Sequence, residues 1–78
     1  MAVEDKVKEI LNKVIDVKPE EIEPDKGLDV LFDVDSTEMV EISVGLKKEL
    51  GIDLKDNELK KTHSFNEIVK ILKEKGAN

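Results

Sequence analysis

Apolar residues recur at helical spacing in three separate segments of this 78-residue chain. This periodicity constrains the fold more than any other feature, because residues three and four positions apart share one face of a helix. The three stripes, apolar except at Ser43, are Val3, Val7, Ile10, Leu11, Val14 and Ile15; Met39, Ile42, Ser43, Leu46 and Leu50; and Phe65, Ile68, Val69 and Leu72. No segment has the alternation typical of a strand. We therefore predict an all-α fold, a small three- to four-helix bundle with a long first loop, forming a single domain over residues 1–78.

The second helix has a clear predicted start. Asp35 is a favoured N-cap residue, and Glu38, three positions later, completes the pattern of a reciprocal capping box. Ser36 then occupies the first helical position with its side chain facing outward, and Gly51 ends the helix. The free N–H groups and positive dipole of a helix start favour a phosphate. Ser36 is therefore the residue best placed to carry chemistry.

The same capping pattern, Ser64 followed by Glu67, predicts the start of the last helix, and Gly76 is expected to end it. The segment before it, residues 55–61, is heavily charged and contains one leucine. We expect a single short helical turn there, capped by Asp56, as the fourth helix of the bundle.

The connection between the first two helices exceeds the usual length of about 15 residues for a loop in a compact domain. Such a connection is either functional or contains a short helix. Apolar residues along it indicate that it is pinned across the core; they are Ile22, Leu28, Val30, Leu31, Phe32 and Val34.

Composition excludes several classes of protein. A net charge of −6 argues against nucleic acid, because its phosphates would be repelled. The chain has no cysteine, so it needs no oxidising compartment. No apolar run approaches the roughly 20 residues that span a bilayer. We expect a soluble cytoplasmic protein without a membrane span.

Negative charge is concentrated around Ser36. Residues 20–41 contain nine Asp and Glu residues, and Lys26 is their only basic neighbour within that stretch. Such a field steers a basic partner towards Ser36. The alternative is that the acidic residues only keep a small protein soluble.

Few residues qualify for catalysis or metal binding. His63 is the only histidine and precedes a predicted helix, where a surface or packing role is usual; a lone serine without a base is not an activated nucleophile. Residues 33–37 resemble the start of a calcium loop, but an EF-hand requires glycine at loop position six and a carboxylate at twelve. Glu38 and Val44 occupy those positions, and zinc ligands are absent. We predict neither an enzyme nor a metal site.

Modification of Ser36 remains, and the residues by themselves leave three alternatives open. Ser36 presents its hydroxyl for modification by a partner enzyme, is phosphorylated by an acid-directed kinase in a helical interaction module, or is simply a helix-start serine.

A wider pattern separates these alternatives. Asp35-Ser36-Thr37, followed by Met39-Val40-Glu41, Leu46 and Gly51-Ile52, resembles the acyl carrier protein family, whose signature is Asp-Ser-Leu at the start of the second helix. The resemblance covers nearly the whole chain. It implies that Ser36, flanked by Asp35, carries 4′-phosphopantetheine donated by coenzyme A. That group supplies the thiol that a chain without cysteine lacks, and the thiol holds an acyl group as a thioester. The implied role is that of a carrier in fatty-acid, polyketide or related lipid biosynthesis.

The outer face of the second helix is the expected docking surface, which we call the docking strip. Its residues are Thr37, Glu38, Val40, Glu41, Val44 and Lys48. The resemblance implies a monomer whose partners have basic docking surfaces: a phosphopantetheinyl transferase, and acyl-transfer and chain-elongating enzymes. The alternative is that Val40 and Val44 merely widen the core face.

Three positions depart from the family pattern. Thr37 replaces the usual leucine, Lys47-Lys48 stand where acidic residues are common, and Gly45 within the helix costs roughly 1 kcal/mol relative to alanine. These departures argue against service to the housekeeping fatty-acid enzymes, and they leave two alternatives open: a housekeeping carrier, or a specialised carrier for a polyketide, lipid-modifying or other secondary pathway.

Overall fold

Four α-helices follow one another along the chain: α1 (Val3–Ile15), α2 (Leu28–Phe32), α3 (Ser36–Leu50) and α4 (Phe65–Glu74). A 3-10 turn, η1 (Pro19–Glu21), lies between α1 and α2. This computed structural model describes residues 2–55 and 57–77. Within these ranges there is no strand, and the one isolated bridge pairs Gly27 with Ser64. The predicted all-α bundle is confirmed.

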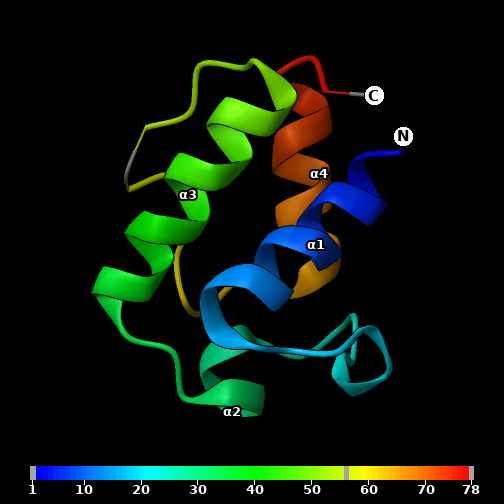
Figure 1. Cartoon of the computed structure of the whole chain (residues 1–78), viewed down its shortest axis with the longest axis vertical. Helices are drawn as coiled ribbons and strands as arrows, with labels where there is room; N and C mark the ends of the chain where they lie inside the picture. The colour runs from blue at the N-terminus through cyan, green and yellow to red at the C-terminus, as the bar shows by residue number, and fades with distance from the viewer. Residues whose placement is uncertain (1, 56, 78) are drawn as a thin grey trace.

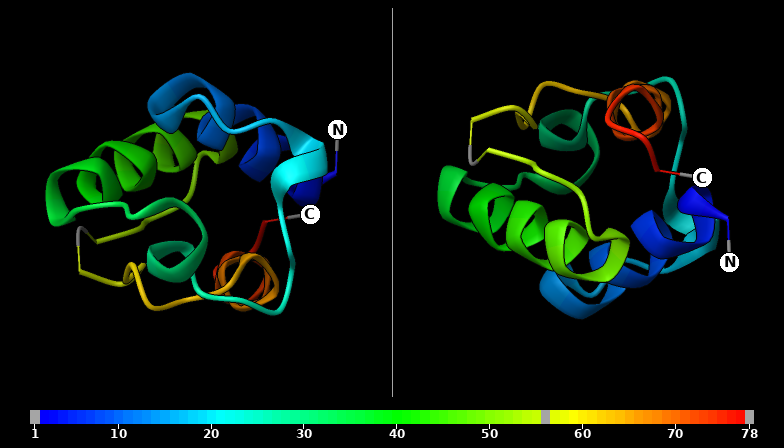
Figure 2. Two further views of the ribbon diagram at one scale, coloured as in Figure 1. Left: turned by 90° about the horizontal axis from the view of Figure 1, so that it is seen from below. Right: turned by 90° about the horizontal axis from the view of Figure 1, so that it is seen from above.

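Helix α1 packs against both α3 and α4, and in Figure 1 it crosses in front of α4 with α3 to one side. The connection from α3 to α4 occupies the remaining side of the bundle, between these two helices (Figure 2). The first and last helices bring the two ends of the described chain close together (Figure 1), where Lys73 Nζ and Glu4 Oε2 are 3.2 Å apart.

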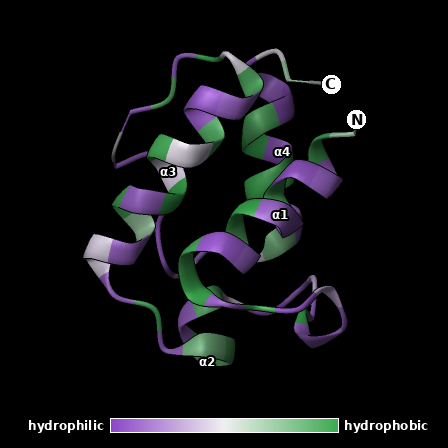
Figure 3. Cartoon of the chain, viewed as in Figure 1, coloured by the Kyte–Doolittle hydropathy of each residue, from purple (hydrophilic) through white to green (hydrophobic). Residues whose placement is uncertain are grey.

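The core is formed by the stripes that the sequence predicts. Apolar and polar residues alternate along the helices in bands, as amphipathic helices require (Figure 3). Residues such as Leu11 of α1, Ile42 of α3 and Ile68 of α4 are completely buried, and Leu50 at the end of its stripe is half-buried against the same core. No helix in the described part of the chain is both long enough and apolar enough to cross a bilayer.

The long connection after α1 contains a short helix, α2, as one of the two alternatives expected. Leu28 and Val34 are buried and pin this connection to the core, whereas Val30 is 74% exposed and is not an anchor. The chain leaves α2 through Asp33, whose φ of 53° is left-handed, a conformation that aspartate tolerates better than most residues. This turn directs the chain into α3.

The short helix expected in residues 55–61 is not formed by the described residues of that segment, and its expected cap, Asp56, lies outside them. Lys55 and Glu58 instead close a turn: the Glu58 N–H donates to the Lys55 carbonyl at 3.2 Å, and the Lys55 N–H donates to Glu58 Oε1 at 3.0 Å. One buried side chain, Leu59, anchors the segment. A single apolar anchor does not repay the cost of nucleating a helix, so the turn prevails.

The segment before α4 docks on the first turn of α2. The Leu28 N–H donates to the His63 carbonyl at 3.1 Å, and the Asp29 N–H donates to the Lys61 carbonyl at 2.9 Å. A Cβ on Gly27 would lie 2.8 Å from the Thr62 carbonyl oxygen, so this approach requires glycine. The contact fixes residues 61–63 beside the chain that leads into α3.

Candidate functional site

Ser36 occupies the first position of α3, as predicted, and its side chain is exposed. The capping box that fixes it is complete. The Glu38 N–H donates to Asp35 Oδ1 at 2.8 Å, and the Asp35 N–H donates to Glu38 Oε1 at 3.0 Å. Buried Val34 anchors the chain immediately before the cap. A hydroxyl is therefore presented to solvent at a rigid helix start, where backbone dipoles favour an anion.

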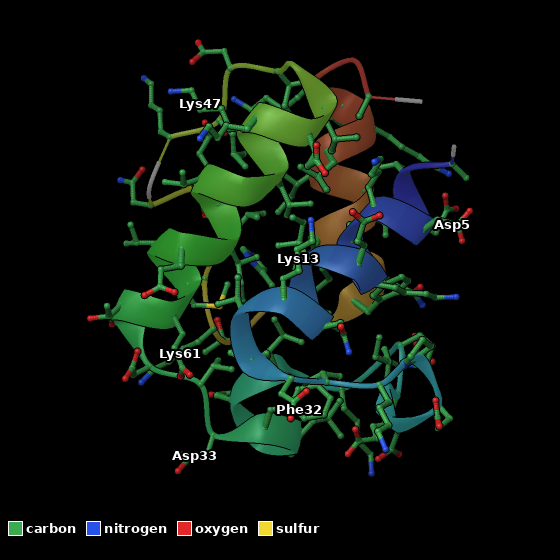
Figure 4. The ribbon with its side chains drawn as sticks, in the orientation of Figure 1. Asp5, Lys13, Phe32, Asp33, Lys47 and Lys61 are labelled. Carbon is green, nitrogen blue, oxygen red and sulfur yellow. The ribbon has the colours of Figure 1, made fainter. Side chains whose placement is uncertain are left out.

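A cleft of about 380 Å³ opens beside Ser36. It lies between the first turn of α3 and the segment that precedes α4, and it is lined by Ser36, Met39, Val40, Asn57, Leu59, Lys60, Lys61 and Thr62. Met39 and Leu59 are buried and make its inner wall apolar, whereas Lys60 and Lys61 are exposed and add positive charge. Figure 4 shows Lys61 near the N-terminal end of α3 and Lys47 at the opposite end.

Comparison with known proteins identifies this arrangement. The sequence model of a family described as "Phosphopantetheine attachment site" matches residues 5–72. The chain is 33% identical over 75 residues to an acyl carrier protein from Picosynechococcus, an alignment that covers 95% of this chain and 93% of that protein. It is 32% identical over 71 residues to an acyl carrier protein from Petrotoga mobilis, which covers 91% and 84% respectively. The chain belongs to the acyl carrier protein family.

A more specialised relative is the meromycolate extension acyl carrier protein of Mycobacterium tuberculosis. It is 32% identical over 63 residues, which cover 81% of this chain and 55% of that protein. Membership of the family establishes a carrier role in fatty-acid or related lipid synthesis, with covalently bound 4′-phosphopantetheine as the prosthetic group.

The residues around Ser36 fit this prosthetic group. A phosphodiester on the Ser36 hydroxyl would carry its negative charge at the positive end of α3. Lys60 and Lys61, which line the same cleft, add favourable charge. The apolar inner wall, formed by Met39 and Leu59, suits the apolar part of a cargo.

The structure places the predicted docking strip on the outer face of this carrier's α3. Thr37, Glu41 and Lys48 are exposed, and the two valines, Val40 and Val44, are 38% and 44% exposed. They do not widen the core face. Apolar side chains exposed among charged ones are a common composition for a transient interface. Docking at this strip remains a prediction.

Glu38 differs from the rest of the docking strip. Its side chain is half-buried and accepts the Asp35 N–H, so it stabilises the start of α3. Glu41, one turn further along and exposed, presents its carboxylate to solvent. Of these two carboxylates, Glu41 is the better candidate for steering a partner.

Sequence reasoning missed the far wall of the cleft. Asn57, Lys60, Lys61 and Thr62 belong to a segment more than 20 residues away from Ser36 in the sequence, and no local pattern connects the two. The signal that was present is the charge of this segment, which is basic where residues 20–41 are acidic.

His63 has a local structural role, in line with the expectation of a surface or packing residue. It is half-buried, and its Nδ1 accepts the Lys60 N–H at 3.0 Å. Across residues 2–55 and 57–77, no three His, Cys, Asp or Glu side chains converge as a metal site would require.

Proposed function

We propose that Ser36 is the residue of this carrier to which 4′-phosphopantetheine is attached. One observation carries the assignment. The chain contains three serines, and Ser36 is exposed whereas Ser43 and Ser64 are 1% and 4% exposed. Ser64 is further committed to capping α4 through its bond from the Glu67 N–H at 3.2 Å. A transferase therefore has one serine hydroxyl that it can reach without unfolding the bundle.

Attachment replaces the O–H bond of Ser36 by an O–P bond. In the same step a P–O bond in the pyrophosphate linkage of coenzyme A breaks, adenosine 3′,5′-bisphosphate leaves, and the hydroxyl proton passes to a base of the transferase. The bound group supplies a thiol, on which acyl chains are held as thioesters. The chain itself contributes position and charge, and we assign it no catalytic step.

We further propose that the docking strip and the acidic stretch of residues 20–41 bring the partners to Ser36. Val40 and Val44 offer exposed apolar area, and Glu41 offers a carboxylate beside them. The acidic residues would attract a basic enzyme surface at long range, and the two valines would contact it once it has docked. These partners are the transferase and the acyl-transfer and chain-elongating enzymes of the pathway, met by a monomeric carrier in the cytoplasm.

The departures at Thr37, Lys47 and Lys48 support service in a specialised pathway. Thr37 stands beside the attachment site, and both lysines are exposed in the last turn of α3. Positive charge there is favourable to the helix dipole but repels a basic partner surface. We therefore place this carrier with enzymes whose docking surface is less basic at that end of α3.

Intact mass measurement tests the attachment site. Incubation with coenzyme A and a broad-specificity phosphopantetheinyl transferase is expected to add one phosphopantetheinyl group, and Ser36→Ala is expected to add none. Thr37→Val, which removes the neighbouring hydroxyl, is the matched control and should still be modified. Modification that persists in Ser36→Ala would overturn the assignment. A phosphate-sized addition on protein from its native host would favour the kinase alternative.

A further inference from the structure

Ser43 is a buried hydroxyl without a partner. It lies on the core face of α3, is 1% exposed, and its Oγ has no hydrogen-bond partner among the residues that the structure describes. A serine inside a helix commonly donates to the carbonyl four residues earlier, but that bond is not formed with Met39. An unpaired buried hydroxyl destabilises a core, so alanine would serve the fold better at this position.

The position of Ser43 relates it to the proposed attachment site. Met39 lines the cleft beside Ser36, and Ser43 follows Met39 by four residues, so the two are neighbours on one face of α3. Ser43 also follows Ser36 by seven residues, which is about two helical turns or 10 Å along the axis. A chain that passes inward from the cleft along α3 would meet Met39 first and Ser43 next.

The side chains along this face of α3 determine what such an acyl chain would contact. Met39 and Leu59 offer apolar contact to an acyl chain at the cleft. Ile42 and Leu46, which flank Ser43 along α3, are completely buried. An oxygen on the acyl chain would lose its water there and would need a protein partner. A serine hydroxyl can supply one, because it both donates and accepts.

We propose that Ser43 is a specificity-determining residue for the cargo, and that its hydroxyl bonds an oxygen on a hydroxylated or oxo-substituted acyl chain. This inference rests on the proposed attachment at Ser36. It assigns to this carrier an acyl class more polar than a fully saturated chain.

The test compares cargoes in two backgrounds. Wild-type protein and Ser43→Ala are loaded from the corresponding coenzyme A thioesters with octanoyl, 3-hydroxyoctanoyl or 5-oxooctanoyl groups, and loading is verified by intact mass. In Ser43→Ala, the oxygenated cargo is expected to give a lower Tm than octanoyl. The difference in Tm between the octanoyl form and the oxygenated form is then compared in the two proteins. For at least one oxygenated cargo, this difference should be smaller in the wild type than in Ser43→Ala by about 4 °C or more, the shift expected for one hydrogen bond in a domain of this size.

Val3→Ala is the matched control. It shortens an apolar side chain of α1 that is completely buried but does not line the cleft, and it should shift the Tm of all cargo forms by the same amount. An equal difference in Tm in wild type and Ser43→Ala for both oxygenated cargoes would overturn the inference, as would an octanoyl group that leaves the Tm unchanged relative to the unacylated form. In either case the attachment at Ser36 would stand, because it is judged separately by the mass of the loaded protein.

Discussion

Asp35 and Glu38 hold each other at the start of α3, the carboxylate of each accepting the backbone N–H of the other at 2.8 and 3.0 Å. Ser36 lies between them in the sequence and has its backbone fixed by both bonds. The same pair thus determines where the helix begins and which hydroxyl is presented at its first turn.

Replacing the cap should loosen this start. Asp35→Ala removes the acceptor for the Glu38 N–H and is expected to cost about 1 kcal/mol of stability, measured by urea unfolding. The phosphopantetheinylation rate should fall as well, because the first turn frays. Asp35→Asn, which retains an acceptor oxygen, is the control and should lose little of either. Unchanged stability in Asp35→Ala would show that the capping box does not secure the helix.

Charge reversal at Glu41 tests the docking strip. Glu41→Lys should slow association with the transferase a few-fold at low salt, corresponding to roughly 0.2–1 kcal/mol for one exposed charge. The effect should shrink as salt shortens the screening length to about 10 Å at 0.1 M. Glu74→Lys on α4 changes the net charge equally and is the control. Equal slowing in both variants would mean that only net charge matters.

Replacement by alanine should have opposite effects on the stability of the fold at Gly27 and at Gly45. Gly27→Ala places a Cβ 2.8 Å from the Thr62 carbonyl oxygen, a backbone atom, and should destabilise the fold by roughly 1–3 kcal/mol. The Leu28 and Asp29 amides, whose acceptors belong to residues 61–63, should then exchange faster with solvent.

The matched change, Gly45→Ala, brings its Cβ within 3.0 Å of Ile10 Cδ1, the end of a flexible side chain. Ile10 also lines an open groove of about 420 Å³ and so has room to move. The gain in helix propensity is up to about 1 kcal/mol, so this variant should be at least as stable as wild type in urea. A loss comparable to that of Gly27→Ala would contradict this account.

Acid should destabilise the fold partly through Glu67. The bond from the Ser64 N–H holds the pKa of Glu67 below its ordinary value of 4.5. A lowered pKa means that the unfolded chain binds the proton more readily, so the stabilisation is present above about pH 4.5 and is lost as the pH falls through the folded-state pKa.

Glu67→Gln keeps the acceptor but does not titrate, so its stability should fall less steeply than that of wild type between about pH 5 and 3. Part of the dependence of stability on pH should remain in Glu67→Gln, because two other carboxylates also have lowered pKa values. The hydrogen bond from Lys75 lowers the pKa of Glu58, and backbone bonding together with Lys73 lowers the pKa of Glu4. Identical slopes in chemical denaturation at a series of pH values would exclude this role for Glu67.

The sequence by itself determined the three long helices and the presentation of Ser36. Capping boxes join residues three apart, and amphipathic stripes join residues three and four apart, so both depend only on residues that are close together in the sequence. Asp35 with Glu38, and Ser64 with Glu67, form the predicted bonds for this reason.

Tertiary structure alone decided where the short helix lies and what faces Ser36. Helix α2 forms at residues 28–32 because the carbonyls of Lys61 and His63 satisfy its first N–H groups, while the charged segment expected to form a helix closes a turn instead. The same contact fixes the segment that carries Lys60, Lys61 and Thr62, the far wall of the cleft. Such partners are distant in sequence, and a helix too short to be stable alone forms only where folding brings them together.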